Sequence, residues 1–163
     1  MSVAEDWAVT TSATGRLMIV VDGIPVPQGS KKIRPSGGKP GGRPVLVEDN
    51  DVRHRSWRAE VVAAARHAAS GRPALLGPVL VSLLFRFPHP KYHYRTGRFA
   101  GVLKDGTPRF HSGTPDIDKL ERHIFDALTI AGIYRDDGQV ADGRRSKVYS
   151  ERPGVTIIVE SLG

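Results

Sequence analysis

Three aspartates in the C-terminal half of the chain have the type and spacing that a metal site requires. Asp116 and Asp118 are separated by one residue, and Asp137 follows after a predicted helix. Side chains at positions i and i+2 of an extended stretch point to the same side, and a turn and short strand after the helix can return Asp137 beside them. Three convergent carboxylates repel one another unless a cation offsets their charge. A hard divalent cation such as Mg²⁺ takes oxygen ligands of this kind, so the spacing predicts a magnesium site.

The same residues also have ordinary structural interpretations. Asp118 precedes a predicted helix and suits its N-cap, with Glu121 at capping-box spacing. Asp136-Asp137-Gly138 is typical of a turn. Asp142 is interpreted as a charge on the surface of a strand. The residues alone therefore leave a catalytic site and a purely structural arrangement both open.

The histidines are weaker candidates for chemistry. His89 and His93 have a metal-like spacing, but they lie in a predicted loop without an evident third ligand, so zinc is not expected. His123 is predicted to be a surface histidine.

Apolar periodicity predicts one α+β domain over residues 1–163, with a small mixed sheet and two main helices. The helices are expected at 51–70 and at about 119–131, where Leu120, Ile124 and Leu128 form an apolar stripe. Strands are expected at 16–26, 45–47, 78–88, 139–149 and 155–160. Residues 1–15 are predicted to be a loose terminus, 27–44 a mobile basic loop, and 89–113 a second basic loop.

Charge indicates the kind of partner. The chain has 24 Lys and Arg against 17 Asp and Glu, a formal net charge of +7. Such an excess favours a polyanion, because neutralising phosphates releases condensed counterions. There are no cysteines, which excludes disulfides and thiolate chemistry. No apolar run approaches the ~20 residues of a membrane span, and the N-terminus lacks a secretory signal, so a cytoplasmic protein is expected.

Three motifs follow one another in the C-terminal half, namely Thr-Pro-Asp-Ile-Asp-Lys-Leu at 114–120, Asp-Ala-Leu at 126–128 and Asp-Asp-Gly-Gln-Val at 136–140. Together they resemble the RusA family of Holliday-junction resolvases. The family shows Asp-x-Asp-Asn-Leu, Asp-Ala-Leu and Asp-Asp-x-Gln-Val in this order and at this spacing. Residues 25–31 resemble an N-terminal segment of phage-borne members.

The resemblance implies a RusA-like fold and assigns roles to individual positions. Asp116, Asp118 and Asp137 match the acidic residues of the family's metal site. The family's catalytic lysine falls on Arg122, and its asparagine after the second aspartate falls on Lys119. Arginine keeps the positive charge but cannot be deprotonated, so Lys119 is an alternative source of the catalytic cation.

The resemblance also implies an activity: resolution of four-way DNA junctions in recombination and repair by paired phosphodiester hydrolysis. The metal would be Mg²⁺, with Mn²⁺ as an alternative, and a C2 homodimer would supply two sites for the paired nicks. The two basic loops would grip backbone phosphates, with Tyr92 and Tyr94 available to stack at an opened junction. The residues expected to bind DNA are Lys31, Lys32, Arg34, Lys91 and Arg95. Two alternatives remain, a basic nucleic-acid-binding module without catalysis and a nuclease for flap or single-stranded DNA.

Overall fold

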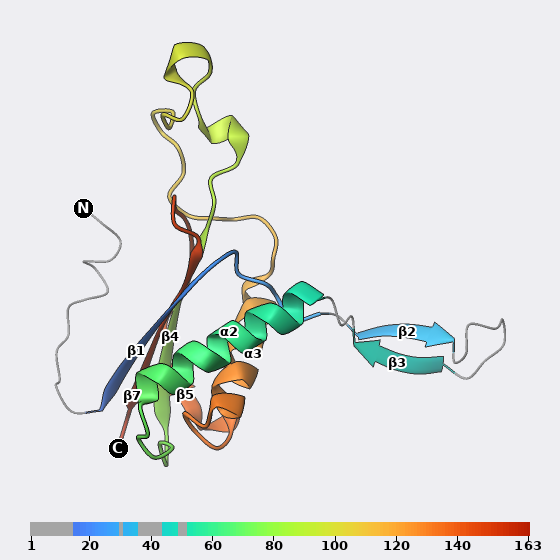
Figure 1. Cartoon of the computed structure of the whole chain (residues 1–163), viewed down its shortest axis with the longest axis vertical. Coiled ribbons are helices and arrows are strands. Elements are labelled where there is room, and N and C mark those ends of the chain that lie inside the picture. Colours follow the sequence, from blue (N-terminus) through green and yellow to red (C-terminus); the bar gives the residue numbers. More distant parts are fainter. Residues whose placement is uncertain (1–14, 30, 36–43, 49–51) are drawn as a thin grey trace.

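A mixed five-stranded sheet forms the centre of the molecule in this computed structural model, which describes residues 15–29, 31–35, 44–48 and 52–163 (Figure 1). Its strands are, in spatial order, β1 (Arg16–Asp22), β7 (Gly154–Ser161), β4 (Val79–Phe87) and finally β5 (Val140–Asp142) with β6 (Arg145–Tyr149), which both pair with β4. Strand β7 is antiparallel to its two neighbours, whereas β5 and β6 are parallel to β4. The predicted α+β class and mixed sheet are confirmed.

Strand β4 is buried along nearly its whole length, which explains its uninterrupted apolar sequence. Val81, Leu83 and Phe85 are fully buried in the main core, and Leu84 on the opposite face is also buried. Because side chains on both faces of β4 are buried, the strand shows no alternation of apolar and polar residues.

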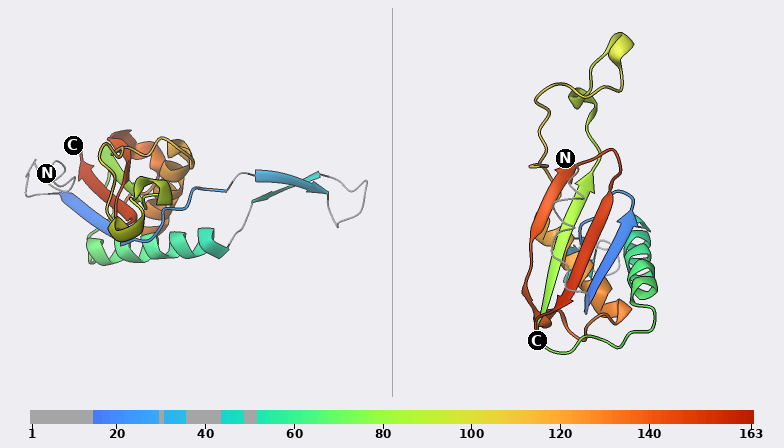
Figure 2. Two further views of the ribbon diagram at one scale, coloured as in Figure 1. Left: turned by 90° about the horizontal axis from the view of Figure 1, so that it is seen from above. Right: turned by 90° about the vertical axis from the view of Figure 1, so that its left-hand side faces the viewer.

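Two helices pack on one face of the sheet, α2 (Val52–Ala69) and α3 (Ile117–Ala131) (Figure 2). Leu120, Ile124 and Leu128 form the buried stripe of α3, as the periodicity predicted. Gly132 ends α3 in a left-handed conformation, with φ of 78°, and its N–H donates to carbonyls of the last turn. Neither described helix is both long and apolar enough to cross a membrane.

Helix α3 begins two residues earlier than predicted, and its N-cap is Asp116 instead of Asp118. The N–H of Leu120 donates to the Asp116 carbonyl at 3.2 Å, which closes the first turn. Asp118 therefore lies inside that turn, and the expected capping box with Glu121 is wrong. Both aspartates suit a cap, so the local sequence does not choose between them. A capping box does form further along the chain, between Asp136 and Gln139.

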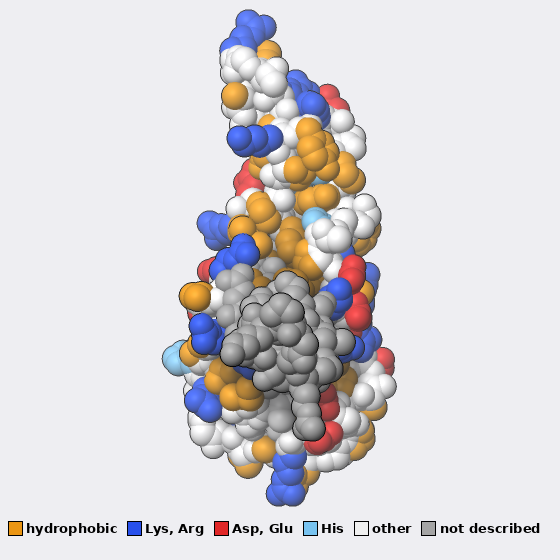
Figure 3. Space-filling model, turned by 90° about the vertical axis from the view of Figure 1, so that its right-hand side faces the viewer, with side chains coloured by type: hydrophobic (Ala, Val, Ile, Leu, Met, Phe, Trp, Pro, Cys, Tyr) orange, Lys and Arg blue, Asp and Glu red, His pale blue; other side chains and the backbone are white. Residues whose placement is uncertain are grey.

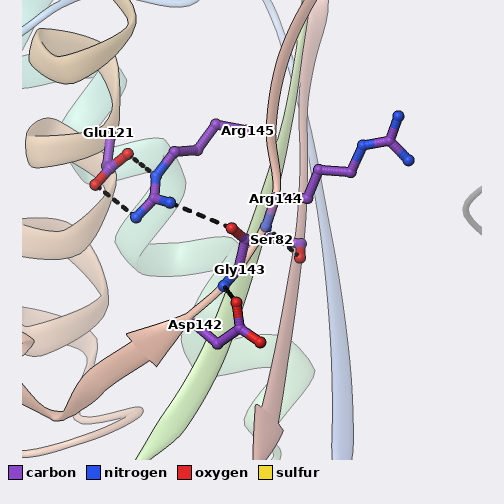
Figure 4. Close-up of polar contacts among 6 residues, drawn as sticks. All are labelled: Ser82, Glu121, Asp142, Gly143, Arg144 and Arg145. Atoms are coloured by element: carbon purple, nitrogen blue, oxygen red, sulfur yellow. Dashed lines mark hydrogen bonds and ion pairs between the residues drawn. The ribbon is translucent and has the colours of Figure 1, made fainter.

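A glycine at the break between β5 and β6 sets the register of β6. Gly143 has a φ of 152°, and a Cβ there would lie 1.8 Å from the carbonyl oxygen of Val81. The next residue, Arg144, donates its N–H to Ser82 Oγ at 3.0 Å and accepts from the N–H of Leu83 (Figure 4). Only glycine allows this close crossing, after which β6 pairs with the second half of β4.

Two segments project from the sheet and helices (Figure 1). Strands β2 (Lys31–Pro35) and β3 (Pro44–Glu48) form an antiparallel hairpin, so residues 31–35 lie in a strand and not in the predicted loop. Backbone pairing with β3 overrides the loop-like composition of residues 31–35. The second projection, residues 89–113, is here called the arm. It contains the short 3₁₀ helices η2 (Lys91–His93) and η3 (Gly97–Phe99).

Candidate active site

An acidic pair lies at the N-terminus of α3. Asp116 is the extended N-cap residue, with φ of −65° and ψ of 140°, and its side chain makes no capping hydrogen bond. Asp118 follows in the first turn, and both side chains are exposed. The positive end of the helix dipole tolerates this concentration of negative charge. The pair is therefore open to a ligand from solvent.

Cationic side chains surround the acidic pair. Lys119 Nζ lies 3.2 Å from the Asp116 carboxylate. Arg122 is exposed one turn after Asp118 on the same face of α3. Carboxylates that suit a metal and cations that suit a phosphate thus occur together at the N-cap and in the first two turns of α3.

A further cation, Lys147 on β6, fixes the chain that leads into Asp116. Its ammonium group donates to the carbonyls of Gly113 and Pro115 at 2.6 and 2.8 Å. Partial burial lowers the pKa of Lys147, while the nearby Asp116 carboxylate opposes that shift. Sequence reasoning missed Lys147, because its partners are backbone carbonyls more than 30 residues away.

An ion pair joins α3 to β6 two residues before Lys147. The guanidinium of Arg145 donates through Nε and Nη2 to the two carboxylate oxygens of Glu121, and through Nη1 to the Gly143 carbonyl at 3.2 Å (Figure 4). A bidentate pair of this kind fixes orientation as well as distance. This ion pair therefore holds the start of α3, which carries the acidic pair, against β6, and the register of β6 depends on Gly143.

Asp137 lies at the other end of α3 and does not join the acidic pair within one chain. It begins the 3₁₀ helix η4 (Asp137–Gln139), and the Gln139 side chain donates to the carbonyls of Leu75 and Gly77, just before β4. Asp116, by contrast, lies beside Lys147, which pairs with Phe85 near the end of β4. Asp137 therefore lies near the start of β4, at Val79, whereas Asp116 lies near Phe85. These two positions on β4 are six residues apart, or roughly 20 Å at ~3.3 Å per residue. In the part of the chain that the structure describes, no three carboxylate or histidine side chains are grouped to hold a metal ion.

The residues expected to bind DNA are distributed over both projections. Lys91 is exposed on the arm, whereas the Arg95 guanidinium is paired with Asp105 at 2.8 Å. The side chains of Lys31, Lys32 and Arg34 lie outside what the structure describes, although their backbone forms β2.

His123 is buried, so its prediction as a surface histidine is wrong. Its ring is 1% exposed and stacks on His54 from α2, with the centroids 4.0 Å apart. Its Nδ1 donates to the carbonyl of Val26 at 2.7 Å. Burial lowers the pKa of His123 to about 4, and the neighbouring His54 and Arg58 add to that shift. The residue has a structural role between the two helices.

Comparisons with known proteins cover most of the chain. The family model described as "Endodeoxyribonuclease RusA" matches residues 22–160, which include both ends of α3 and all of β6. The "Uncharacterized protein YqaN" of Bacillus subtilis (strain 168) is 29% identical over 146 residues, which are 90% of this chain and 96% of that protein.

Proposed function

This chain belongs to the RusA family of endodeoxyribonucleases, and from that premise we propose that it resolves four-way DNA junctions by metal-dependent phosphodiester hydrolysis. Membership of the family supports a hydrolase that cleaves DNA. Metal-dependent hydrolysis is supported by the exposed pair Asp116 and Asp118, with Lys119 and Arg122 in the first two turns of the same helix. Because the proposed substrate is DNA, the proposed location is the cytoplasm of a bacterial or phage-infected cell.

The acidic pair fits a hard divalent cation. Its exposed carboxylates offer the oxygen donors that Mg²⁺ or Mn²⁺ prefers, and the helix N-terminus already holds their negative charge in place. When bound, such a cation would lower the pKa of water and offset the charge of the scissile phosphate.

The chain's own cations act on the phosphate. Arginine does not act as an acid or base, so the role of Arg122 is to hold the phosphate and to stabilise negative charge as it grows. Lys119 offsets the charge of Asp116 at 3.2 Å and can turn toward the substrate. Lys147 keeps the segment before Asp116 fixed through its two carbonyl contacts.

The third carboxylate comes from a second copy of the chain. Asp137 is too far from Asp116 and Asp118 of its own chain, because they lie at opposite ends of α3. In a C2 dimer every contact occurs twice, so an interface that brings Asp137 to the acidic pair of the partner also forms the reciprocal site. Two identical sites are what paired nicks across a symmetric junction require.

The basic projections would hold the DNA around these sites. Lysine and arginine side chains occur along the arm beside hydrophobic ones (Figure 3). The exposed cations of the arm are Lys91, Arg98, Lys104 and Arg109. These side chains can contact backbone phosphates without reading sequence, which suits an enzyme that recognises shape.

Cleavage of a synthetic four-way junction tests this proposal. The parent protein should cut the junction with Mg²⁺ but not with EDTA, and should cut linear duplex, flap and single-stranded DNA much more slowly. Asp116→Asn, Asp118→Asn and Asp137→Asn should each abolish cleavage while junction binding in EDTA persists, because each removes one charged oxygen ligand. Cutting of flaps or single strands in preference to junctions would show a different substrate. Binding without any cleavage would show a non-catalytic module.

A further inference from the structure

A pocket lies where the arm joins the sheet, and its walls are aromatic. It has a volume of about 340 Å³ and is lined by rings from three separate segments, namely Tyr92, Phe110 and Tyr149. Tyr92 and Phe110 are 69% and 58% exposed, although large aromatic side chains normally gain from burial. Lys104, Asp105 and Ser112 are among the other residues that line it.

The pocket is preformed, because neighbouring side chains fix its Tyr149 wall. The Tyr149 ring is surrounded by three imidazoles, those of His89, His93 and His111, with centroids 5.3, 4.7 and 4.9 Å away. His93 is only 5% exposed, so this wall is anchored in the protein. Burial and the neighbouring Tyr92 hydroxyl raise the pKa of Tyr149, so the ring stays neutral.

The opposite wall is fixed by the sheet. Phe110 forms a β-bridge with Val148, and the guanidinium of Arg109 lies 5.6 Å from the Phe110 ring. The ring is therefore held open to solvent by its backbone, and a cation lies beside it. Tyr94, expected from the sequence to stack on DNA, is half-buried with its ring edge-on to His89, and it does not line the pocket.

The ligand that fits these walls is planar, has an apolar face and carries negative charge nearby. The arm contains five basic residues, Lys91, Arg95, Arg98, Lys104 and Arg109, against the single acid Asp105. A nucleobase meets this description, because any base can stack on an aromatic ring while its phosphate contacts a neighbouring cation. The volume lies within the range of roughly 300–1,000 Å³ that is usual for small-molecule sites.

We propose that this pocket binds an unstacked nucleobase next to the scissile phosphate, an inference that rests on the proposed function for its location relative to the chemistry. Tyr149 lies two residues beyond Lys147 on the same side of β6, or ~7 Å along the strand. Lys147 in turn contacts the carbonyl that precedes Asp116. That separation is about two base-pair rises of 3.4 Å, so a base within about two nucleotides of the cleaved bond can reach the pocket.

The pocket would make the enzyme selective for branched DNA. A base inside a duplex must be unpaired and unstacked before it can enter, whereas a base at a branch point pays less of that cost. Duplex DNA would still contact the basic arm through its phosphates, but it would leave the pocket empty.

Binding measured in EDTA tests the pocket without requiring cleavage. A junction with 2-aminopurine at the branch point, a single strand and a linear duplex would each be titrated with the parent protein and with variants. Tyr92→Ala and Phe110→Ala should weaken binding of the junction and the single strand by about 5- to 150-fold, the range for loss of one stacked base. Duplex binding should be unchanged. Tyr92→Phe and Phe110→Trp should restore tight binding and the fluorescence change of the stacked 2-aminopurine.

Phe99→Ala provides the matched control. Phe99 is a 47% exposed aromatic residue on the same arm with Arg98 over its ring at 4.7 Å, but it does not line the pocket. If Tyr92→Ala and Phe110→Ala bind the junction as Phe99→Ala does, the pocket does not hold a base, whether or not the parent protein cleaves junctions. If these variants lose binding but the parent protein never cleaves, the pocket stands and the proposed function fails. Equal losses for all three substrates would indicate a damaged arm and would also overturn the proposal.

Discussion

Co-expression of Asp118→Asn chains with Asp137→Asn chains should restore nicking that neither variant shows by itself. In a mixed dimer, one site would combine both substitutions and would be inactive. The other site would combine the intact Asp118 of one chain with the intact Asp137 of the other. This recovery is expected because Asp137 lies roughly 20 Å along β4 from Asp116 and Asp118 of its own chain. One chain therefore cannot bring these three aspartates, here called the trio, together.

The size of the recovery follows from symmetry. Random pairing of equal amounts of two chains gives about half mixed dimers, and each of them has one intact site of two. About a quarter of the sites should therefore be active. They should produce single nicks, because a mixed dimer cannot cut both sides of the junction. If each chain held its own trio, every site would carry a substitution and the recovery would be zero.

The assay is the initial rate of strand nicking on a labelled four-way junction with Mg²⁺, at equal total protein. The matched control mixes parent chains with chains that carry both Asp118→Asn and Asp137→Asn. With shared sites only the parent homodimers cut, which leaves about a quarter of the activity. With sites inside one chain, half would remain. A complementation rate of zero together with half-activity in the control would refute the shared trio.

Three further outcomes are expected. Arg122→Lys should retain substantial cleavage whereas Arg122→Ala should lose most of it in single-turnover measurements; full activity of Arg122→Ala with a dead Lys119→Ala would assign the catalytic cation to Lys119. Gly143→Ala should lower the melting temperature by roughly 4–8 °C in calorimetry, since a positive φ and a Cβ 1.8 Å from the Val81 carbonyl cost at least about 2 kcal/mol; an unchanged melting temperature would contradict the close crossing. His123, with its pKa lowered to about 4, stays neutral in the fold while the unfolded chain protonates near pH 6.5, so its contribution to stability is lost as the pH falls. Between pH 7 and pH 5 this amounts to about 2 kcal/mol in urea unfolding, and His123→Gln should remove most of that pH dependence.

Local features of the structure were predictable from the sequence. The stripe Leu120, Ile124 and Leu128 predicts α3 because helical periodicity depends only on nearby residues, and Gly132 ends the helix where its left-handed conformation is needed. Strand β4 was predictable from its apolar run between two prolines. The aspartate motifs likewise identified the family, since order and spacing are properties of the chain itself.

Long-range contacts decided the features that could not be predicted from the sequence. The sequence could not show that Lys147 holds the carbonyls before Asp116, or that Arg145 pairs with Glu121, because both contacts depend on the register of β6 against β4. Nor could it show that His123 is buried, which results from the packing of α2 on α3.

The position of Asp137 shows most clearly what the sequence determines and what only the tertiary structure decides. The sequence by itself determined that three acidic residues occur in a fixed order around one helix. Only the tertiary structure decided that the helix keeps Asp137 away from the other two, because a rigid helix of 15 residues separates its ends by about 22 Å. The short turn that follows packs against the start of β4 instead of returning to Asp116.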